Sequence, residues 1–281
     1  MNRSMRRGLA ASLTILGIVI VSADVRSQAG RGRGGAPPSA EIPAPPLSAL
    51  APENLNKPRP KAPFDLTGTW FITGRPPGGG WLFGRTAEVL PTLTPSAQKH
   101  FDAYAAAAKD GKVYRDDIGQ CWPAGMPVIM TRVWPIAMIQ LPTAIYMTSE
   151  FMNSFRVIYL DGRQHTDPDL VVRTFNGESI GRWEGDTLVV DTRNFTDLDK
   201  HWVDQGIPAS KDFRMIERYR LLDNGSTLEG EWTLIDPQNW KGEWKGTRRW
   251  NRVTDHDIQE VECLPDLNEH LQSTSSGVHV R

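Results

Sequence analysis

Residues 227–234 read Thr-Leu-Glu-Gly-Glu-Trp-Thr-Leu, so that apolar or small residues alternate with polar ones. Alternation with a period of two is typical of a β-strand that turns one face toward a core. Residues 66–73, Leu-Thr-Gly-Thr-Trp-Phe-Ile-Thr, follow the same pattern. These two stretches predict a mainly β protein.

Further strand candidates, separated by turn signals such as Asp-Gly and Asn-Gly, occur along the chain. Their regular spacing favours a single antiparallel β-barrel or sandwich. The apolar run 128–147 is interrupted by Arg132, Gln140 and two prolines, so we interpret it as two buried strands joined by a turn. The remaining candidates are residues 144–150, 155–160, 170–174, 187–192, 213–222 and 244–252.

One helix is expected near residues 95–111. Thr94 can cap its N-terminus, Pro95 suits the first turn, and Gly111 follows an alanine-rich run.

The N-terminus has the layout of a signal peptide. Three arginines precede an apolar run that ends at Ala23, and this run is shorter than the roughly 20 residues of a spanning helix. We expect cleavage after Ala23 and a periplasmic or extracellular location without membrane insertion, the alternative being an uncleaved anchor. The expected organisation is a signal peptide at 1–23, a disordered Pro/Gly-rich spacer at 24–62, a barrel domain at 63–263 and a tail at 264–281.

Charge and cysteine content limit the possible partners and the compartment. Removing the three arginines of the signal peptide from 32 basic residues leaves 29 against 33 acidic residues, a net charge of −4, which makes nucleic acid an unsuitable partner. Cys121 and Cys263 are the two cysteines of the chain. An exported chain meets an oxidising compartment, so we expect them to form a disulfide, the alternative being two buried thiols.

The densest polar cluster runs from Arg156 to Asp191. Arg163 and His165 follow the Asp161-Gly162 turn and alternate along an extended segment, so they could address one ligand. Histidine can move a proton near neutral pH, and arginine can stabilise developing negative charge. The candidate catalytic residues are Asp161, Arg163, His165 and Asp186. The alternative is that these residues only form turns and surface ion pairs.

Ten tryptophans could fill a core or line a cavity for an apolar ligand. We therefore add several arginines, acids and tryptophans as candidate ligand contacts, namely Arg156, Arg182, Trp183, Glu184, Glu217, Trp70 and Trp232. The histidines lack the spacings of common metal motifs, so no metal site is expected, and the sequence does not indicate a cofactor.

Several motifs resemble those of a family of secreted bacterial proteins with no assigned activity. They are FDLTGTW (64–70), CWPAGMP (121–127), RVIYLDGRQH (156–165), SIGRWEGDTLVVDT (179–192), ERYR (217–220), Asp-Pro at 236–237 and Glu-x-x-Cys at 260–263. This resemblance implies export and a single domain. The Gly68-Thr69-Trp70 sequence, with Arg248 and Arg249 late in the chain, is also similar to the Gly-x-Trp and late-strand arginine of lipocalin-like barrels.

Three hypotheses for the function follow from these observations. The first is an exported β-barrel that binds a small, largely apolar molecule oriented by arginine and tryptophan side chains. The second is a small-molecule lyase, isomerase or hydrolase in which His165 and a carboxylate act as acid and base and arginine stabilises negative charge. The third is a structural envelope protein. The oligomeric state is left open.

Overall fold

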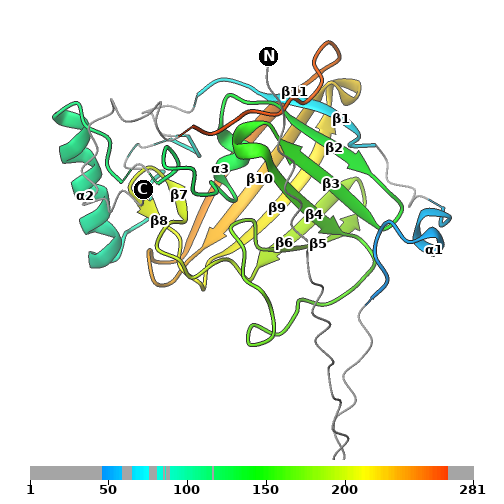
Figure 1. The fold of residues 1–281 in the computed structure, drawn as a ribbon, viewed down its shortest axis with the longest axis horizontal. Helices are drawn as coiled ribbons and strands as arrows, with labels where there is room; N and C mark the ends of the chain where they lie inside the picture. Colours follow the sequence, from blue (N-terminus) through cyan, green and yellow to red (C-terminus); the bar gives the residue numbers. More distant parts are fainter. Residues whose placement is uncertain are drawn as a thin grey trace, which may run out of the picture. The chain divides into compact units, whose positions relative to one another are not determined.

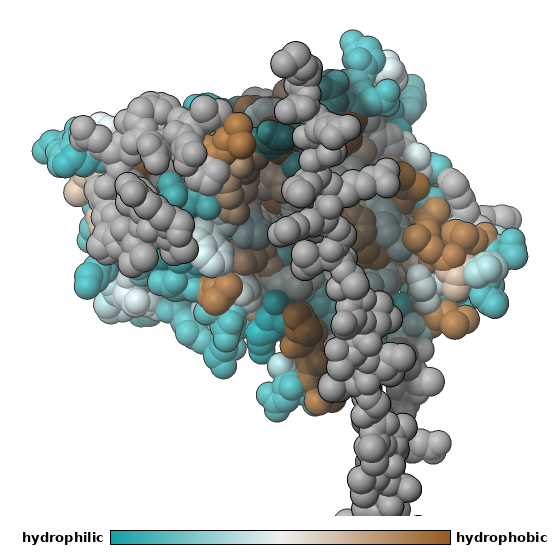
Figure 2. All heavy atoms as spheres, in the orientation of Figure 1, coloured by the Kyte–Doolittle hydropathy of each residue, from teal (hydrophilic) through white to brown (hydrophobic). Residues whose placement is uncertain are grey.

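The computed structural model describes residues 46–58, 65–75, 81–84, 86, 89–115 and 117–264. The predicted signal peptide lies outside the described residues, as do most of the predicted spacer and residues 265–281 of the predicted tail. Residues 46–58 of the spacer contain a short helix, α1 (Pro52–Leu55), with exposed leucines that appear as brown side chains around α1 in Figure 2. Within the described residues, no helix is long and apolar enough to cross a membrane.

The protein is mainly β, as predicted, and a closed barrel forms its centre (Figure 1). Around the barrel the strands follow the order β1-β11-β10-β9-β6-β5-β4-β3-β2, with β2 returning to β1. The strands are β1 (Gly68–Ile72), β2 (Ile136–Gln140), β3 (Ala144–Ser149), β4 (Ser154–Tyr159), β5 (Glu178–Glu184), β6 (Thr187–Arg193), β9 (Arg214–Leu222), β10 (Thr227–Ile235) and β11 (Glu243–Val253).

All neighbouring strands of the barrel are antiparallel except β4 and β5, which run parallel. Only two residue pairs join them, Ile158 with Ser179 and Tyr159 with Ile180. A parallel pair needs a long crossover connection, and residues 160–177 provide it. For this reason Asp161-Gly162 begins a long loop instead of forming the expected hairpin turn.

The loop also explains two differences from the predicted strands. Residues 170–174 form a turn and an isolated bridge instead of a strand, and Leu170 and Val172 are 80% and 85% exposed. Strand β5 was not predicted, because Ser179 and Gly181 on its buried face give no apolar alternation. A Cβ atom at Gly181 would lie 2.7 Å from Leu160, so this strand needs glycine where the Leu160 side chain packs.

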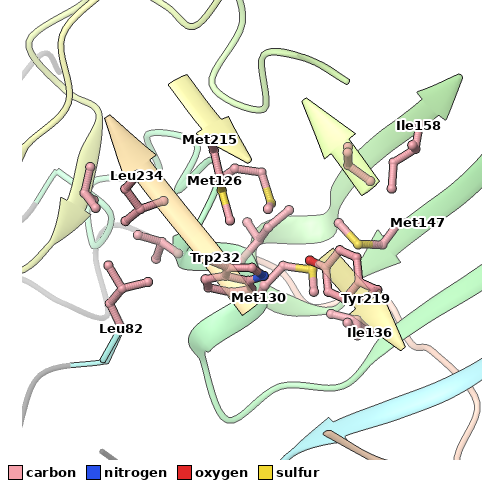
Figure 3. Close-up of a cluster of buried hydrophobic side chains, with 14 of the residues drawn as sticks. Leu82, Met126, Met130, Ile136, Met147, Ile158, Met215, Tyr219, Trp232 and Leu234 are labelled. Carbon is pink, nitrogen blue, oxygen red and sulfur yellow. The ribbon is translucent and has the colours of Figure 1, made fainter. Parts of the chain in front are cut away.

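The core fills the barrel with large side chains. Trp70, Trp232, Trp244 and Trp250 are each at most 1% exposed, and the rings of Trp232 and Trp250 lie 5.5 Å apart. Figure 3 shows Met126 and Met130 close to Trp232 and Met215 in this core. These four tryptophans therefore have the core-filling role that the sequence left as one of two alternatives.

A stacked arginine lies at the end of the barrel where β1 begins. The guanidinium carbon of Arg252 is 4.3 Å from the centre of the Trp70 ring, and its Nη1 donates a hydrogen bond to the Thr67 carbonyl. A Cβ atom on Gly68 would lie 2.5 Å from Nη1, so glycine is required there. The lipocalin-like pattern in the sequence suggested Arg248 or Arg249 as the late-strand arginine. In the structure, Arg248 donates to the Gly74 carbonyl and Arg249 pairs with Glu229.

A short helix, α3 (Val128–Thr131), enters the opposite end of the barrel, where β2 begins and β3 ends. This segment was predicted as a strand, yet all four of its residues are buried in one helical turn. Helix ends leave carbonyl groups without partners, and here Trp250 and Ser149 donate hydrogen bonds to the carbonyls of Met130 and Ile129.

The remaining elements pack outside the barrel. Helix α2 (Pro95–Lys109), capped by Thr94 as predicted, lies beside the small sheet of β7 (Trp202–Asp204) and β8 (Ile207–Pro208) in Figure 1. Two 3₁₀ turns, η1 (Phe151–Asn153) and η2 (Asp223–Gly225), complete the elements. The expected disulfide joins Cys121 to Cys263.

The disulfide ties the C-terminal segment to the loop after α2, across 142 residues of sequence. We predict that a Cys121→Ser/Cys263→Ser variant loses up to about 5 kcal/mol of unfolding free energy, because the unfolded chain is no longer constrained. Urea denaturation measures the loss. Reductant should bring the wild type to the same midpoint and leave the variant unchanged, and an unchanged wild type would contradict the prediction.

The burial of His201 should make the unfolding free energy depend on pH. His201 is fully buried among phenylalanine rings, its Nε2 donates to the Met126 carbonyl at 2.7 Å, and burial lowers its pKa to about 4. The unfolded chain binds a proton near pH 6.5, so between pH 6.5 and 4 the unfolded state holds more protons and stability falls as pH falls.

The expected loss of unfolding free energy over this pH range is about 3 kcal/mol. Urea denaturation at a series of pH values measures it, and a His201→Gln variant should show a smaller slope between pH 6.5 and 4. An equal slope in the variant and the wild type would show that another group causes the pH dependence.

Candidate functional site

The structure divides the predicted polar cluster between the inside and the outside of the barrel. Arg156 on β4 and Glu217 on β9 are 2% and 0% exposed and form an ion pair inside the barrel, where the Nη1 to Oε1 distance is 3.0 Å. The guanidinium also donates to Ser179 on β5 at 2.9 Å and to Thr192 on β6 at 2.8 Å. One arginine thus connects four strands.

These hydrogen bonds reinforce the weakest junction of the barrel. Strands β4 and β5 share only two residue pairs, and the Arg156 side chain extends from β4 over β5 and β6 to β9. Burial by itself would lower the pKa of Arg156, but the Glu217 carboxylate raises it above its usual value. Arg156 therefore keeps its positive charge, and Glu217 is its partner inside the core.

Tyr219 completes the buried network by donating its hydroxyl to Glu217 at 2.5 Å. Burial, together with the nearby Glu217 carboxylate, raises the pKa of Tyr219 well above its usual value, so the phenol stays protonated. Arg156 and Glu217 were predicted as ligand contacts, and in the structure they contact each other within the core. The arrangement fits a structural role.

His165 lies outside the barrel, on the face formed by β5, β6 and β9. Its Nδ1 is 3.1 Å from Glu178, which also accepts hydrogen bonds from Thr166 and Asn194. Its Nε2 lies 3.7 Å from the Asp191 carboxylate, an ion-pair distance that is too long for a hydrogen bond. These contacts attach the 160–177 loop to the barrel wall.

Arginines stabilise the charge of Asp191 in this outer cluster, and hydrogen-bond donors stabilise that of Glu178. Burial would raise the pKa of Asp191, but contacts with His165, Arg214 and Arg193 hold it far below its usual value. Burial has the same opposing effect on Glu178, whose pKa is lowered by the hydrogen bonds from Thr166, His165 and Asn194. Both acids therefore remain ionised at neutral pH and are poor proton donors.

The other predicted charged residues lie at turns or on the surface, whereas the predicted tryptophans belong to the core or pack against it. Asp161 and Arg163 pair with each other at 2.6 Å, and Arg163 stacks on Tyr159. Arg182, whose side chain is 63% exposed, pairs with Glu184, while Asp186 accepts a hydrogen bond from its neighbour Thr187. Trp183 is partly buried against the core, and Trp70 and Trp232 lie within it. None of the four predicted catalytic residues lines the aromatic cleft described next.

A cleft of about 690 Å³ lies outside the barrel strands. It lies between α2 and β7 on one side and α3, η1 and the C-terminal segment on the other. Six aromatic residues line it, namely Trp81, Tyr104, Tyr114, Trp134, Phe151 and Trp202. Its volume falls within the range of pockets that hold small molecules in proteins, and aromatic side chains supply much of its lining.

The polar residues of the cleft differ in how they are partnered. Arg115 forms ion pairs with Asp117 at 3.3 Å and Asp199 at 3.2 Å. The hydroxyl of Tyr114 lies 2.7 Å from Nδ1 of His100, and burial lowers the pKa of His100 and raises that of Tyr114, so both are neutral. Arg132 stacks on Trp81 at 4.6 Å, and its buried Nε has no hydrogen-bond partner among the described residues.

Sequence reasoning missed this cleft, because its residues come from segments far apart in the chain. Arg132 was noticed only as a charge that interrupts the apolar run 128–147. The local signal that could have indicated the cleft was this arginine, two residues before Trp134 in the same apolar run.

No protein-family model matches the chain, and no curated protein matches its sequence. Among the residues that the structure describes, no group of three or more His, Cys, Asp or Glu side chains is placed to hold a metal ion. The candidate site is therefore described from its geometry alone.

A stability experiment tests the structural role of the buried pair. We predict that Arg156→Met lowers the unfolding free energy by about 3 to 5 kcal/mol, because Glu217 is left buried and unpaired. Urea denaturation provides the measurement. The matched control is Arg218→Met, which breaks an exposed pair with Glu184 and should cost less than about 1 kcal/mol.

A double variant, Arg156→Met/Glu217→Gln, should recover part of the stability lost in Arg156→Met, because no unpaired charge remains in the core. Equal losses in Arg156→Met and Arg218→Met would contradict the assignment of this pair as a structural element.

Proposed function

We propose that this protein is exported to the periplasm or the cell exterior and binds a small, largely apolar molecule in the cleft between α2, β7, α3 and the C-terminal segment. The observation that carries the proposal is the cleft of about 690 Å³ lined by six aromatic residues. Ligand sites of small molecules have this size, and aromatic side chains supply large apolar contact area there.

The construction of the cleft supports the proposal. Segments from distant parts of the chain form its walls. The Cys121–Cys263 disulfide anchors the wall formed by Val261–Leu264. Asn153 in η1 also binds this wall, since its side chain exchanges two hydrogen bonds with the backbone of Val261. A disulfide in this position agrees with export, because such bonds persist in oxidising compartments.

The proposal places the ligand outside the barrel. Large side chains fill the barrel interior, whereas the cleft offers both space and aromatic surface. The enzyme hypothesis assigned acid and base roles to His165, Asp161 and Asp186, which lie on the outer face or at turns and do not line the cleft.

The proposal is tested by filling the cleft. Tyr104 and Ala108 are one turn apart on α2, and both line it. We expect an Ala108→Trp variant to weaken binding of apolar probes at least tenfold, because the indole occupies the ligand volume. A library of apolar small molecules is screened by thermal shift against the mature protein, and hits are titrated by quenching of tryptophan fluorescence.

The matched control is Ala106→Trp, an exposed alanine of the same helix that faces away from Tyr104 and Ala108. It should bind the hits as the wild type does. The proposal fails if no apolar molecule shifts the melting temperature, or if both variants bind the hits with unchanged affinity.

A further inference from the structure

The cleft contains a cation in an unusual environment. The Arg132 guanidinium carbon lies 4.6 Å from the Trp81 ring centre and 5.5 Å from that of Phe151. Burial lowers the pKa of Arg132 to about 10, which still leaves the side chain protonated at neutral pH. Arg132 therefore carries a positive charge among aromatic rings, where water screens it poorly.

No ion pair or hydrogen bond of the Arg132 side chain occurs within the described part of the chain, and its buried Nε lacks a partner there. The Asp204 carboxylate attracts Arg132, but it also accepts hydrogen bonds from the backbone N–H groups of Trp81 and Gln205. A second arginine, Arg75, also stacks on Trp81 at 4.4 Å and repels Arg132.

The other arginine of the cleft is compensated. Arg115 is bound by Asp117 and Asp199, and Asp117 also accepts hydrogen bonds from Lys200 and the Trp202 indole. Arg115 and Arg132 of this cleft thus differ, because Asp117 and Asp199 form ion pairs with Arg115, whereas no described acid forms an ion pair with Arg132, although Asp204 attracts it. A ligand with a negative group would gain most by pairing with Arg132.

We propose that the ligand of this cleft is an organic carboxylate, with its carboxylate paired to Arg132 and its apolar body against Trp81, Phe151 and Trp134. The inference rests on the proposed function and names the class of its ligand. A planar guanidinium matches a carboxylate in two parallel hydrogen bonds, which are strong where water is excluded. Pairing would also offset the cost of holding a partly buried charge that has no ion-pair partner among the described residues.

The test compares two ligands that differ only in charge, 2-naphthoate and its neutral analogue 2-naphthamide. Both are titrated into the full mature protein and followed by calorimetry at pH 7. We expect 2-naphthoate to bind at least tenfold more tightly than 2-naphthamide to the wild type. In Arg132→Met this preference should disappear, while 2-naphthamide should bind the variant with undiminished affinity.

Two further variants complete the design. Arg132→Lys keeps the charge and should retain part of the preference for 2-naphthoate, and it substitutes for Arg132→Met if the latter does not fold. Arg218→Met removes an exposed arginine from the outer surface and should leave the preference unchanged. Circular dichroism confirms that each variant is folded.

The outcomes separate this inference from the proposed function. The carboxylate inference is overturned if both probes bind the wild type equally, or if the preference for 2-naphthoate persists in Arg132→Met. In either case, weaker binding of the probes to Ala108→Trp would still support the cleft as the binding site. If neither probe binds and the library gives no hit, both proposals are overturned.

Discussion

The ion pair of Arg156 and Glu217 is the interaction on which the closed barrel depends most directly. Strands β4 and β5 run parallel and share two residue pairs, so backbone pairing contributes little at this junction. The Arg156 side chain bonds Ser179 on β5, Thr192 on β6 and Glu217 on β9. A buried charge is stable only when it is paired and hydrogen-bonded. Because the partners of Arg156 lie on three other strands, these hydrogen bonds fix the positions of the four strands relative to one another.

The packing of the barrel also determines where a ligand can bind. Tryptophans from β1, β10 and β11 fill the interior together with Met126 and Met130. Figure 3 shows these two methionines with Trp232 of β10. Helix α3 enters one end of the barrel, and Arg252 stacks on Trp70 at the other. The space in the described part of the chain lies outside the strands, where α2, β7 and the C-terminal segment surround the proposed binding cleft.

Local patterns predicted elements whose two faces differ in polarity. Strands β1 and β10 alternate clearly, and α2 has a cap, an N-terminal proline and a following glycine, so each was predicted within two residues. Strand β5 has Ser179 and Gly181 on its buried face, and α3 is buried on all sides, so neither shows a periodicity that a local pattern can detect. The motif at 179–192 was noticed for its polar residues, and these proved to belong to two strands of the barrel.

The sequence by itself predicted a β-rich barrel or sandwich, the helix near residues 95–111 and a disulfide between Cys121 and Cys263, because these follow from alternation, capping residues and the number of cysteines. The structure decided for a closed barrel over a sandwich and for the disulfide over two free thiols. Only the tertiary structure decided that Arg156 is paired inside the barrel and His165 outside it, since neighbours in sequence can lie on opposite faces of a barrel wall. It also decided that Arg132 lies in the cleft without an acidic partner from the described residues. Compensation of a charge depends on groups distant in sequence, and no local pattern contains that information.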